Sequence, residues 1–129
     1  MKRLDNKVAI ITGGASGIGK AASQKFVAEG AKVIIWDMNE EQGQATEAEL
    51  GGQAKFYRVN TADSTQVNAA AAEAISAYGK IDILINNAGI TRDATLLKMT
   101  DEQWDQVISV NLKGVFNCTR SLAAHFKEN

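Results

Sequence analysis

The fold is decided by one stretch near the N-terminus, Val8-Ala9-Ile10-Ile11-Thr12-Gly13-Gly14-Ala15-Ser16-Gly17-Ile18-Gly19. Its first four residues form a short apolar run, which is typical of a strand buried on both faces. The glycines stop this run and allow a tight turn. From residue 17 to residue 29 apolar side chains recur every four positions (Ile18, Ala22 and Phe26) and Gly30 follows, so this segment is predicted to be a helix.

The same alternation continues along the chain. Further strands are predicted at residues 33–36, 56–59 and 81–85, and further helices at residues 39–50 and 64–78. Asp63 with Gln66, and Thr100 with Gln103, have the spacing of a capping box at a helix N-terminus. The last segment is predicted to be one long helix that bends near Asn111, because it carries apolar residues at helical spacing: Trp104, Ile108, Leu112, Val115 and Leu122.

Strands that are joined by helices run parallel, and such crossovers are right-handed. The chain is therefore expected to be an α/β protein with a Rossmann-type, doubly wound parallel sheet and helices on both faces. Residues 1–129 are interpreted as one dinucleotide-binding domain that is incomplete at the C-terminus, truncated after the fourth strand and a long helix. The fourth strand would then be an open edge, which favours association with another chain.

Composition excludes several classes of partner. The 14 Lys and Arg residues nearly balance the 15 Asp and Glu residues, so neither nucleic acid nor an anionic membrane is an expected partner. No secretory signal and no run of membrane-spanning length is found, which favours a cytoplasmic location. Cys118, the single cysteine, is expected in the core, and His125, the single histidine, is expected at the surface. No metal site is expected.

The turn between the first strand and the first helix has glycines where nucleotide-binding proteins need them. In such turns the backbone N–H groups of a helix N-terminus face a pyrophosphate, and glycine allows close approach. A plain turn remains the alternative, since three glycines alone are weak evidence. A P-loop is rejected: Gly14 to Gly19 followed by Lys20 fits part of that motif, but Ala21 lacks the hydroxyl that binds magnesium.

Asp37 ends the second predicted strand, 18 positions beyond Gly19 (37 minus 19). This is close to the spacing at which an acidic side chain accepts hydrogen bonds from the adenosine ribose. A 2′-phosphate at the same place would be repelled by the carboxylate, and no Lys or Arg stands at residues 14–16 or 38 to neutralise it. NAD(H) is therefore favoured over NADP(H). The alternative is that Asp37 is a solvated turn residue.

With the glycine loop, Asp37, Asn86-Asn87-Ala88-Gly89 and Asn111 in this order, the chain resembles the short-chain dehydrogenase/reductase family over essentially all 129 residues. The resemblance implies a catalytic role for Asn111, which would hold a water linked to the active-site lysine. Without the family, Asn111 is equally a solvated or kinked helix position, and Asn86-Asn87 a turn that caps its own backbone. The cofactor-binding residues implied are Gly13, Ser16, Gly17, Ile18 and Gly19 at the pyrophosphate and ribose, Asn60 and Thr61 at the adenine, and Asn87, Ala88 and Gly89 beneath the second ribose.

Within the family, Asn86 to Asp93 and Val110-Asn111-Leu112 resemble bacterial 3-oxoacyl-acyl carrier protein reductases and acetoacetyl-coenzyme A reductases. This implies hydride transfer to a small-molecule or acyl-thioester carbonyl, or the reverse oxidation of the alcohol, and a homo-oligomer. Those reductases usually take NADPH and carry a basic residue where this chain has Ser16. The presence of Asp37 departs from that pattern.

The family's chemistry uses a serine and a tyrosine that is followed four residues later by lysine. Tyr57 is followed by Thr61 and Tyr78 by Asp82, so Tyr-x-x-x-Lys is absent. The 129-residue chain alone is therefore predicted to be inactive. Three hypotheses stay open: the cofactor-binding half of an oxidoreductase, a non-catalytic dinucleotide-binding module, and a structural or assembly fragment.

Overall fold

The computed structural model describes residues 2–89 and 98–129, and this part of the chain contains a parallel sheet with the strand order β3-β2-β1-β4. Ile10 of β1 lies opposite Ile34 of β2 on one side and Leu84 of β4 on the other. The central strands β1 and β2 are thus each paired with a strand on both sides, while β3 and β4 are the outer strands. The bounds are Val8–Thr12 for β1, Lys32–Asp37 for β2, Ala54–Arg58 for β3 and Ile83–Ile85 for β4.

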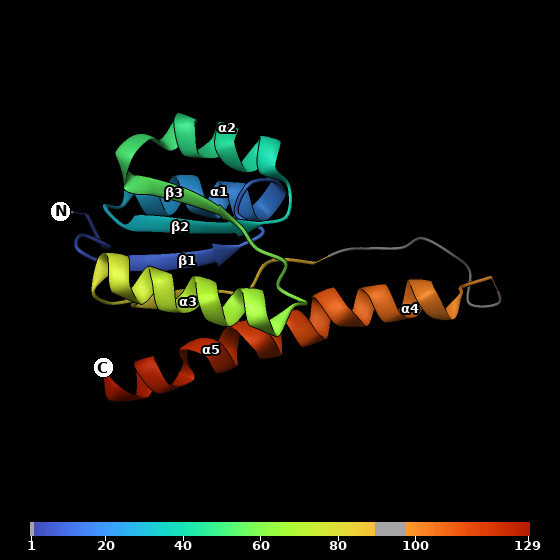
Figure 1. Ribbon diagram of the computed structural model, residues 1–129. Coiled ribbons are helices and arrows are strands. Elements are labelled where there is room, and N and C mark those ends of the chain that lie inside the picture. Colours follow the sequence, from blue (N-terminus) through green and yellow to red (C-terminus); the bar gives the residue numbers. More distant parts are fainter. Residues whose placement is uncertain (1, 90–97) are drawn as a thin grey trace.

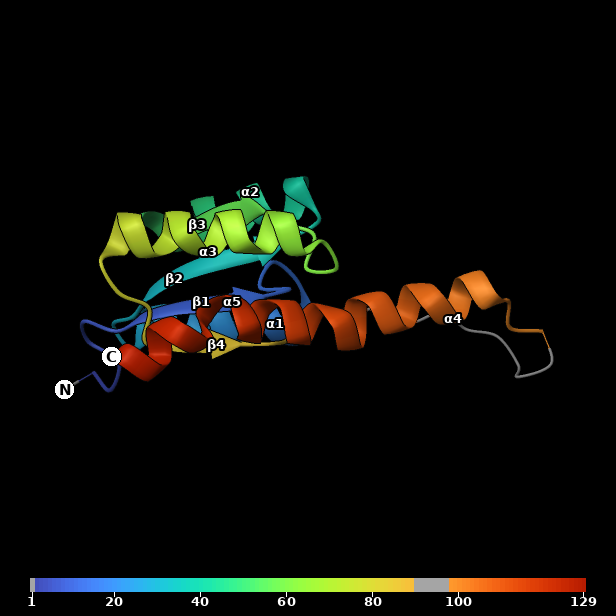
Figure 2. The ribbon, with the colours of Figure 1, turned by 60° about the horizontal axis from the view of Figure 1, so that its bottom comes forward.

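Helices cover both faces of the sheet (Figures 1 and 2). The first face carries α1 (Gly17–Ala28) and α2 (Glu40–Leu50), and the second carries α3 (Ser64–Tyr78) and α5 (Gly114–Glu128). Successive residues of β2 point to opposite faces of the sheet. Ile35 therefore packs in the hydrophobic core under α1 and α2, and Trp36 packs in the core under α3 and α5. The predicted Rossmann-type sheet with helices on both faces is confirmed.

Two strands begin two residues away from the predicted position, and β3 also ends one residue earlier than predicted. The strand predicted at 56–59 is β3, and the strand predicted at 81–85 is β4. Ile81 leaves the ladder because its N–H donates to the side chain of His125, 2.9 Å away. A short 3₁₀ turn, η1 (Gly51–Gln53), ends immediately before β3 and sets its start.

The helix N-termini follow the sequence signals with one exception. The capping box at Thr100 and Gln103 is present at the start of α4 (Asp101–Ile108). The capping box predicted at Asp63 and Gln66 is wrong. Asp63 does cap α3 by accepting from Thr65 and Gln66, but the Gln66 oxygen accepts instead from the N–H of Asn60, at 3.0 Å.

The predicted long helix is interrupted by a wide π turn, η2 (Ser109–Lys113), between α4 and α5. Asn111 lies in this turn, where the bend was expected. The α4 part of this helix extends beyond the carboxyl edge of the sheet (Figure 1). Of its apolar residues, Leu122 is buried, but Leu112 is 63% and Trp104 58% exposed, because no described element covers this part of the helix.

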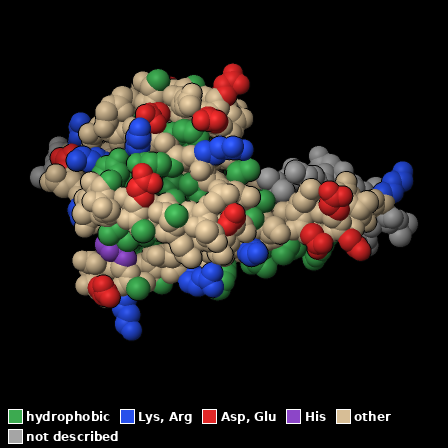
Figure 3. All heavy atoms as spheres, viewed as in Figure 1, with side chains coloured by type: hydrophobic (Ala, Val, Ile, Leu, Met, Phe, Trp, Pro, Cys, Tyr) green, Lys and Arg blue, Asp and Glu red, His purple; other side chains and the backbone are tan. Residues whose placement is uncertain are grey.

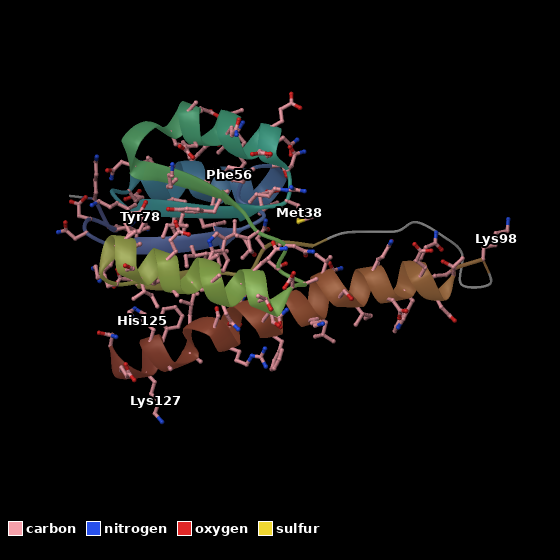
Figure 4. The ribbon with its side chains drawn as sticks, viewed as in Figure 1. Met38, Phe56, Tyr78, Lys98, His125 and Lys127 are labelled. Atoms are coloured by element: carbon pink, nitrogen blue, oxygen red, sulfur yellow. The ribbon has the colours of Figure 1, made fainter. Side chains whose placement is uncertain are left out.

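The single cysteine and histidine both pack against the fold. Cys118 is buried as predicted, and burial raises the pKa of its thiol to about 11. His125, which was expected at the surface, is half-buried, and its Nε2 accepts the N–H of Ile81, 44 residues away in the sequence. Figure 4 shows His125 pointing from α5 toward α3, whereas Lys127 points away. Within residues 2–89 and 98–129, no helix has the length and apolarity to cross a membrane, and no His, Cys, Asp and Glu cluster could hold a metal.

Candidate functional site

A cavity of about 910 Å³ opens at the carboxyl ends of the strands. Its volume is in the upper part of the range of ligand and cofactor sites. It is bounded by the glycine loop, by the ends of β2 and β3, by the segment after β4, and by α4 with the π turn. Eight residues expected at a cofactor line it: Gly13, Ser16, Asp37, Asn60, Thr61, Asn87, Ala88 and Gly89.

The glycine loop is shaped by backbone that other residues adopt only with strain. Gly13 has φ +67° and Gly17 has φ +54°. Gly19 does not line the cavity; a Cβ there would overlap the carbonyl of Gly13 and the amide of Asn87, so its role is to let α1 pack on the loop. Gly17 and Ile18 also lie outside the lining, and Ile18 is 83% exposed.

The N-terminus of α1 is left uncapped by side chains. Ser16 occupies the N-cap position with extended backbone, yet its hydroxyl makes no cap hydrogen bond, and the first turn carries no acidic residue. The free N–H groups and the helix dipole therefore keep a partial positive charge at this end. An anionic group is favoured here.

Thr12 joins the end of β1 to the segment after β4. Its Oγ1 accepts the backbone N–H groups of Asn87 and Ala88, both at 2.9 Å. The side chain of Asn87 donates in turn to the carbonyl of Gly13, at 3.2 Å. Two stretches that are distant in the sequence thus form one rigid wall. Thr12 was not among the predicted site residues, although a buried polar residue at the end of an apolar strand is a usable signal.

Asp37 joins the glycine loop to the end of β2. Its two carboxylate oxygens accept the N–H of Ala15 at 3.2 Å and the N–H of Asn39 at 2.9 Å. A carboxylate has about four acceptor positions, so Asp37 can still accept from a ligand hydroxyl. In the described part of the chain the charged residues that line the cavity are all acidic: Asp37 with Glu102 and Asp105 of α4.

The loop after β3 forms the opposite wall. Asn60 folds back so that its Oδ1 accepts the N–H of Ala62, at 3.0 Å. The carbonyl of Thr61 accepts from the side chain of Asn117 in α5, at 2.9 Å. The N–H of Val59 binds the carbonyl of Asp37 at 3.2 Å, which fixes this loop to β2.

Neither Asn111, which the resemblance assigns to the proton relay, nor the two tyrosines line the cavity. Asn111 does not line it, but a Cβ on Gly89 would lie 3.1 Å from the Asn111 Oδ1, so the two residues are in contact. Tyr57 and Tyr78 lie outside the lining, and burial raises the pKa of both phenols. A raised pKa is the opposite of what a catalytic tyrosine needs.

The sequence did not reveal several lining residues. Met38 directly follows β2 and lines the cavity, and Figure 4 shows it near the carboxyl edge of the sheet. The lining residues of α4 could not be predicted, because they depend on where this helix packs, and the sequence of the helix alone does not determine that. The missed residues are Trp36, Met38, Val59, Ala62, Glu102, Asp105, Gln106, Ser109 and Val110.

The strand order, the glycine loop and the acid after β2 agree with a known group of proteins. The sequence model of the short chain dehydrogenases matches residues 7–129. The chain belongs to the short-chain dehydrogenase family. Ile90 to Asp93, which contribute to its resemblance to the acyl carrier protein reductases, lie outside the described residues.

Curated relatives of this chain support the narrower resemblance. The 3-oxoacyl-[acyl-carrier-protein] reductase of Thermotoga maritima is 48% identical over 126 residues, covering 95% of this chain and 51% of the relative. A subunit of (2S)-[(R)-hydroxy(phenyl)methyl]succinyl-CoA dehydrogenase from Thauera aromatica is 43% identical over 131 residues, covering 98% and 52%. The chain therefore spans about half the length of the curated relatives it matches.

A solved structure agrees with the fold and the resemblance. The crystal structure of 3-ketoacyl-(acyl-carrier-protein) reductase from Brucella melitensis complexed with NADH has a TM-score of 0.94 to this chain, at 38% identity. The match covers 98% of this chain and 52% of that chain.

Proposed function

We propose that this chain binds a nicotinamide dinucleotide in the cleft at the carboxyl ends of its strands. The observation that carries the proposal is Asp37, a half-buried carboxylate on the cavity wall whose second role is to hold the glycine loop. The loop would face the pyrophosphate, Asp37 the adenosine ribose, Asn60 and Thr61 the adenine, and residues 87–89 the second ribose. Residues 1–129 would form a dinucleotide-binding domain.

The residues present fit such a group. Gly13 and Gly17 hold backbone conformations that leave the loop free of side chains, and the uncapped N-terminus of α1 favours a diphosphate. Gly17, Ile18 and Gly19 would shape and border this anion site rather than line the cavity. The 910 Å³ cavity continues from the loop to the wall at Asn60 and Thr61, as an extended ligand with two nucleotide ends requires.

The charge of the cavity favours NAD(H) over NADP(H). Asp37, Glu102 and Asp105 line it, and the described residues place no Lys or Arg in its lining. The additional phosphate on the adenosine ribose of NADP(H) would be repelled by Asp37, and Glu102 and Asp105 add negative charge to the same cavity. The structure of the relative from Brucella melitensis contains NADH, which supports a nicotinamide dinucleotide as the ligand.

For the longer proteins that this chain resembles, we propose hydride transfer between the cofactor and a small-molecule or acyl-thioester carbonyl. A bound nicotinamide supplies or accepts the hydride. Asn111, in the π turn against Gly89, would hold the water of the proton relay. The 129-residue chain lacks Tyr-x-x-x-Lys, so we expect it to bind the cofactor without turnover.

We further propose that the chain associates with a second copy of itself. Figure 3 shows hydrophobic side chains along the lower side of the α4–α5 helix. The large apolar side chains exposed on this helix are Trp104, Leu112, Val115, Phe116 and Phe126.

A cytoplasmic location stays a prediction.

Calorimetric titration with NADH and NADPH tests the proposed cofactor. NADH is expected to bind and NADPH to bind at least tenfold more weakly. The absence of heat with NADH at millimolar concentration would contradict the proposal. The hypothesis of a structural or assembly fragment would then remain. Turnover of a carbonyl substrate by the 129-residue chain would instead show that our account of the missing catalytic groups is wrong.

A further inference from the structure

Asn117 is a buried polar residue that no part of the proposed site uses directly. It lies in α5, is 2% exposed, and does not line the cavity. Its Nδ2 donates to the backbone carbonyl of Thr61, at 2.9 Å. A buried amide and a buried carbonyl both require a partner, so this bond strongly favours one position of the loop after β3.

The same helix contacts Thr61 one turn earlier. Gly114 packs so closely that a Cβ there would lie 2.8 Å from the Thr61 Oγ1 and 3.3 Å from its Cβ. Thr61 is only 5% exposed as a result. The helix thus holds Thr61 at two places, its carbonyl by Asn117 and its side chain by the backbone of Gly114.

This contact determines the shape of one end of the cavity. Thr61 lines the wall that the loop after β3 provides, and Ser109 and Val110, in the turn before Gly114, line the wall that the helix provides. Because Asn117 ties the loop to the helix, it fixes the separation of these two walls. The other end of the cavity is held by separate hydrogen bonds: the Asn87 N–H donates to the Thr12 Oγ1, and the Asn87 side chain donates to the Gly13 carbonyl.

We propose that Asn117 is a positioning residue for the adenosine end of the cofactor, acting through Thr61. This inference rests on the proposed dinucleotide function. It requires that a change at Asn117 affects ligands that contain adenosine and leaves the nicotinamide end unaffected. A merely structural role would weaken both ends together.

The variant Asn117→Leu removes the amide donor to the Thr61 carbonyl and keeps a side chain of similar size. Gly114→Ala instead displaces the Thr61 side chain, because the added Cβ would lie 2.8 Å from its Oγ1. Ser121→Ala is the matched control, because it removes one hydrogen bond within α5, to the carbonyl of Cys118, without contacting the loop. Each chain is titrated with NADH and ADP-ribose by calorimetry, and with reduced nicotinamide mononucleotide at millimolar concentration by fluorescence. Circular dichroism confirms that each variant is folded.

Asn117→Leu and Gly114→Ala are expected to weaken NADH and ADP-ribose equally, by about fivefold to tenfold. Binding of the mononucleotide should stay within twofold of the parent, and Ser121→Ala should change none of the three. A folded Asn117→Leu variant with parental affinity for ADP-ribose would overturn the inference, as would equal losses for ADP-ribose and the mononucleotide. If the parent itself binds neither NADH nor ADP-ribose, the proposed function fails first.

Discussion

The carboxylate of Asp37 accepts a hydrogen bond from the backbone N–H of Ala15, so the residue that ends β2 also fixes the glycine loop. Besides its turn contact with the N–H of Asn39, this carboxylate thus connects β2 to the loop between β1 and α1. It determines where the loop amides lie while it remains on the cavity wall. Substitutions at Asp37 therefore change loop geometry and ligand charge together, and a test must separate the two.

Asp37→Asn is expected to reduce discrimination against NADPH by about tenfold while the fold is kept. The amide retains one oxygen for a backbone donor, but its neutral charge removes the repulsion of a 2′-phosphate. Asp37→Ala should also weaken NADH, by about 1.5–3 kcal/mol, because a charged hydrogen bond to the ribose is lost. Calorimetry with both cofactors measures each effect, with Glu41→Gln, an exposed α2 residue, as control. An unchanged ratio of NADH to NADPH affinity would remove Asp37 from the site.

Local sequence patterns predicted most of the fold because β1 and β2 are buried on both faces, and short, continuous apolar runs of this kind indicate a buried strand. The signals failed where long-range contacts decide. His125 and Gln66 each bind a backbone N–H outside their own helix, and neither bond has a local signature. The site was predictable where glycine and strand-end residues lie close in sequence, but the wall from α4 depends on how that helix packs.

Gly19→Ala is expected to destabilise the chain by about 1–3 kcal/mol or more, because the added Cβ would overlap the carbonyl of Gly13. Urea unfolding followed by circular dichroism gives the free energy of unfolding. Gly52→Ala is the matched control, since a Cβ there meets nothing within 4 Å and its effect should stay within about 0.5 kcal/mol. Equal stability of the two variants would show that α1 does not pack on the loop as described.

His125→Phe is expected to cost about 1–2 kcal/mol, because the N–H of Ile81 loses the Nε2 acceptor that holds the end of α5. His125→Gln offers a side-chain oxygen in place of Nε2 and should lose less. Thermal and urea unfolding measure both variants beside Lys127→Ala, a change at an exposed residue of the same helix. If phenylalanine and glutamine give the same stability, the hydrogen bond contributes nothing measurable.

The thiol of Cys118 is expected to be unreactive in the folded chain. Burial raises its pKa to about 11, so at pH 8 only about 0.1% is thiolate, which is the reactive form. An aromatic disulfide reagent at pH 8 should label the thiol at a rate that rises by orders of magnitude when urea unfolds the chain. Fast stoichiometric labelling without urea would place Cys118 outside the core.

The exposed apolar face of the α4–α5 helix should determine self-association. Phe116, against whose ring Arg120 packs at 4.5 Å, and Leu112 lie one turn apart and leave large apolar surfaces in water. Burial of such residues at the centre of an interface contributes about 2 kcal/mol or more each, so Phe116→Glu should raise the dimer dissociation constant at least about thirtyfold. Light scattering over a concentration series measures the mass, with Lys127→Glu as a control for added charge away from this face. Parental association in the Phe116→Glu and Leu112→Glu variants would assign the contact to another surface. The outer edge of β4, which pairs with no further strand among the described residues, would be the first to test.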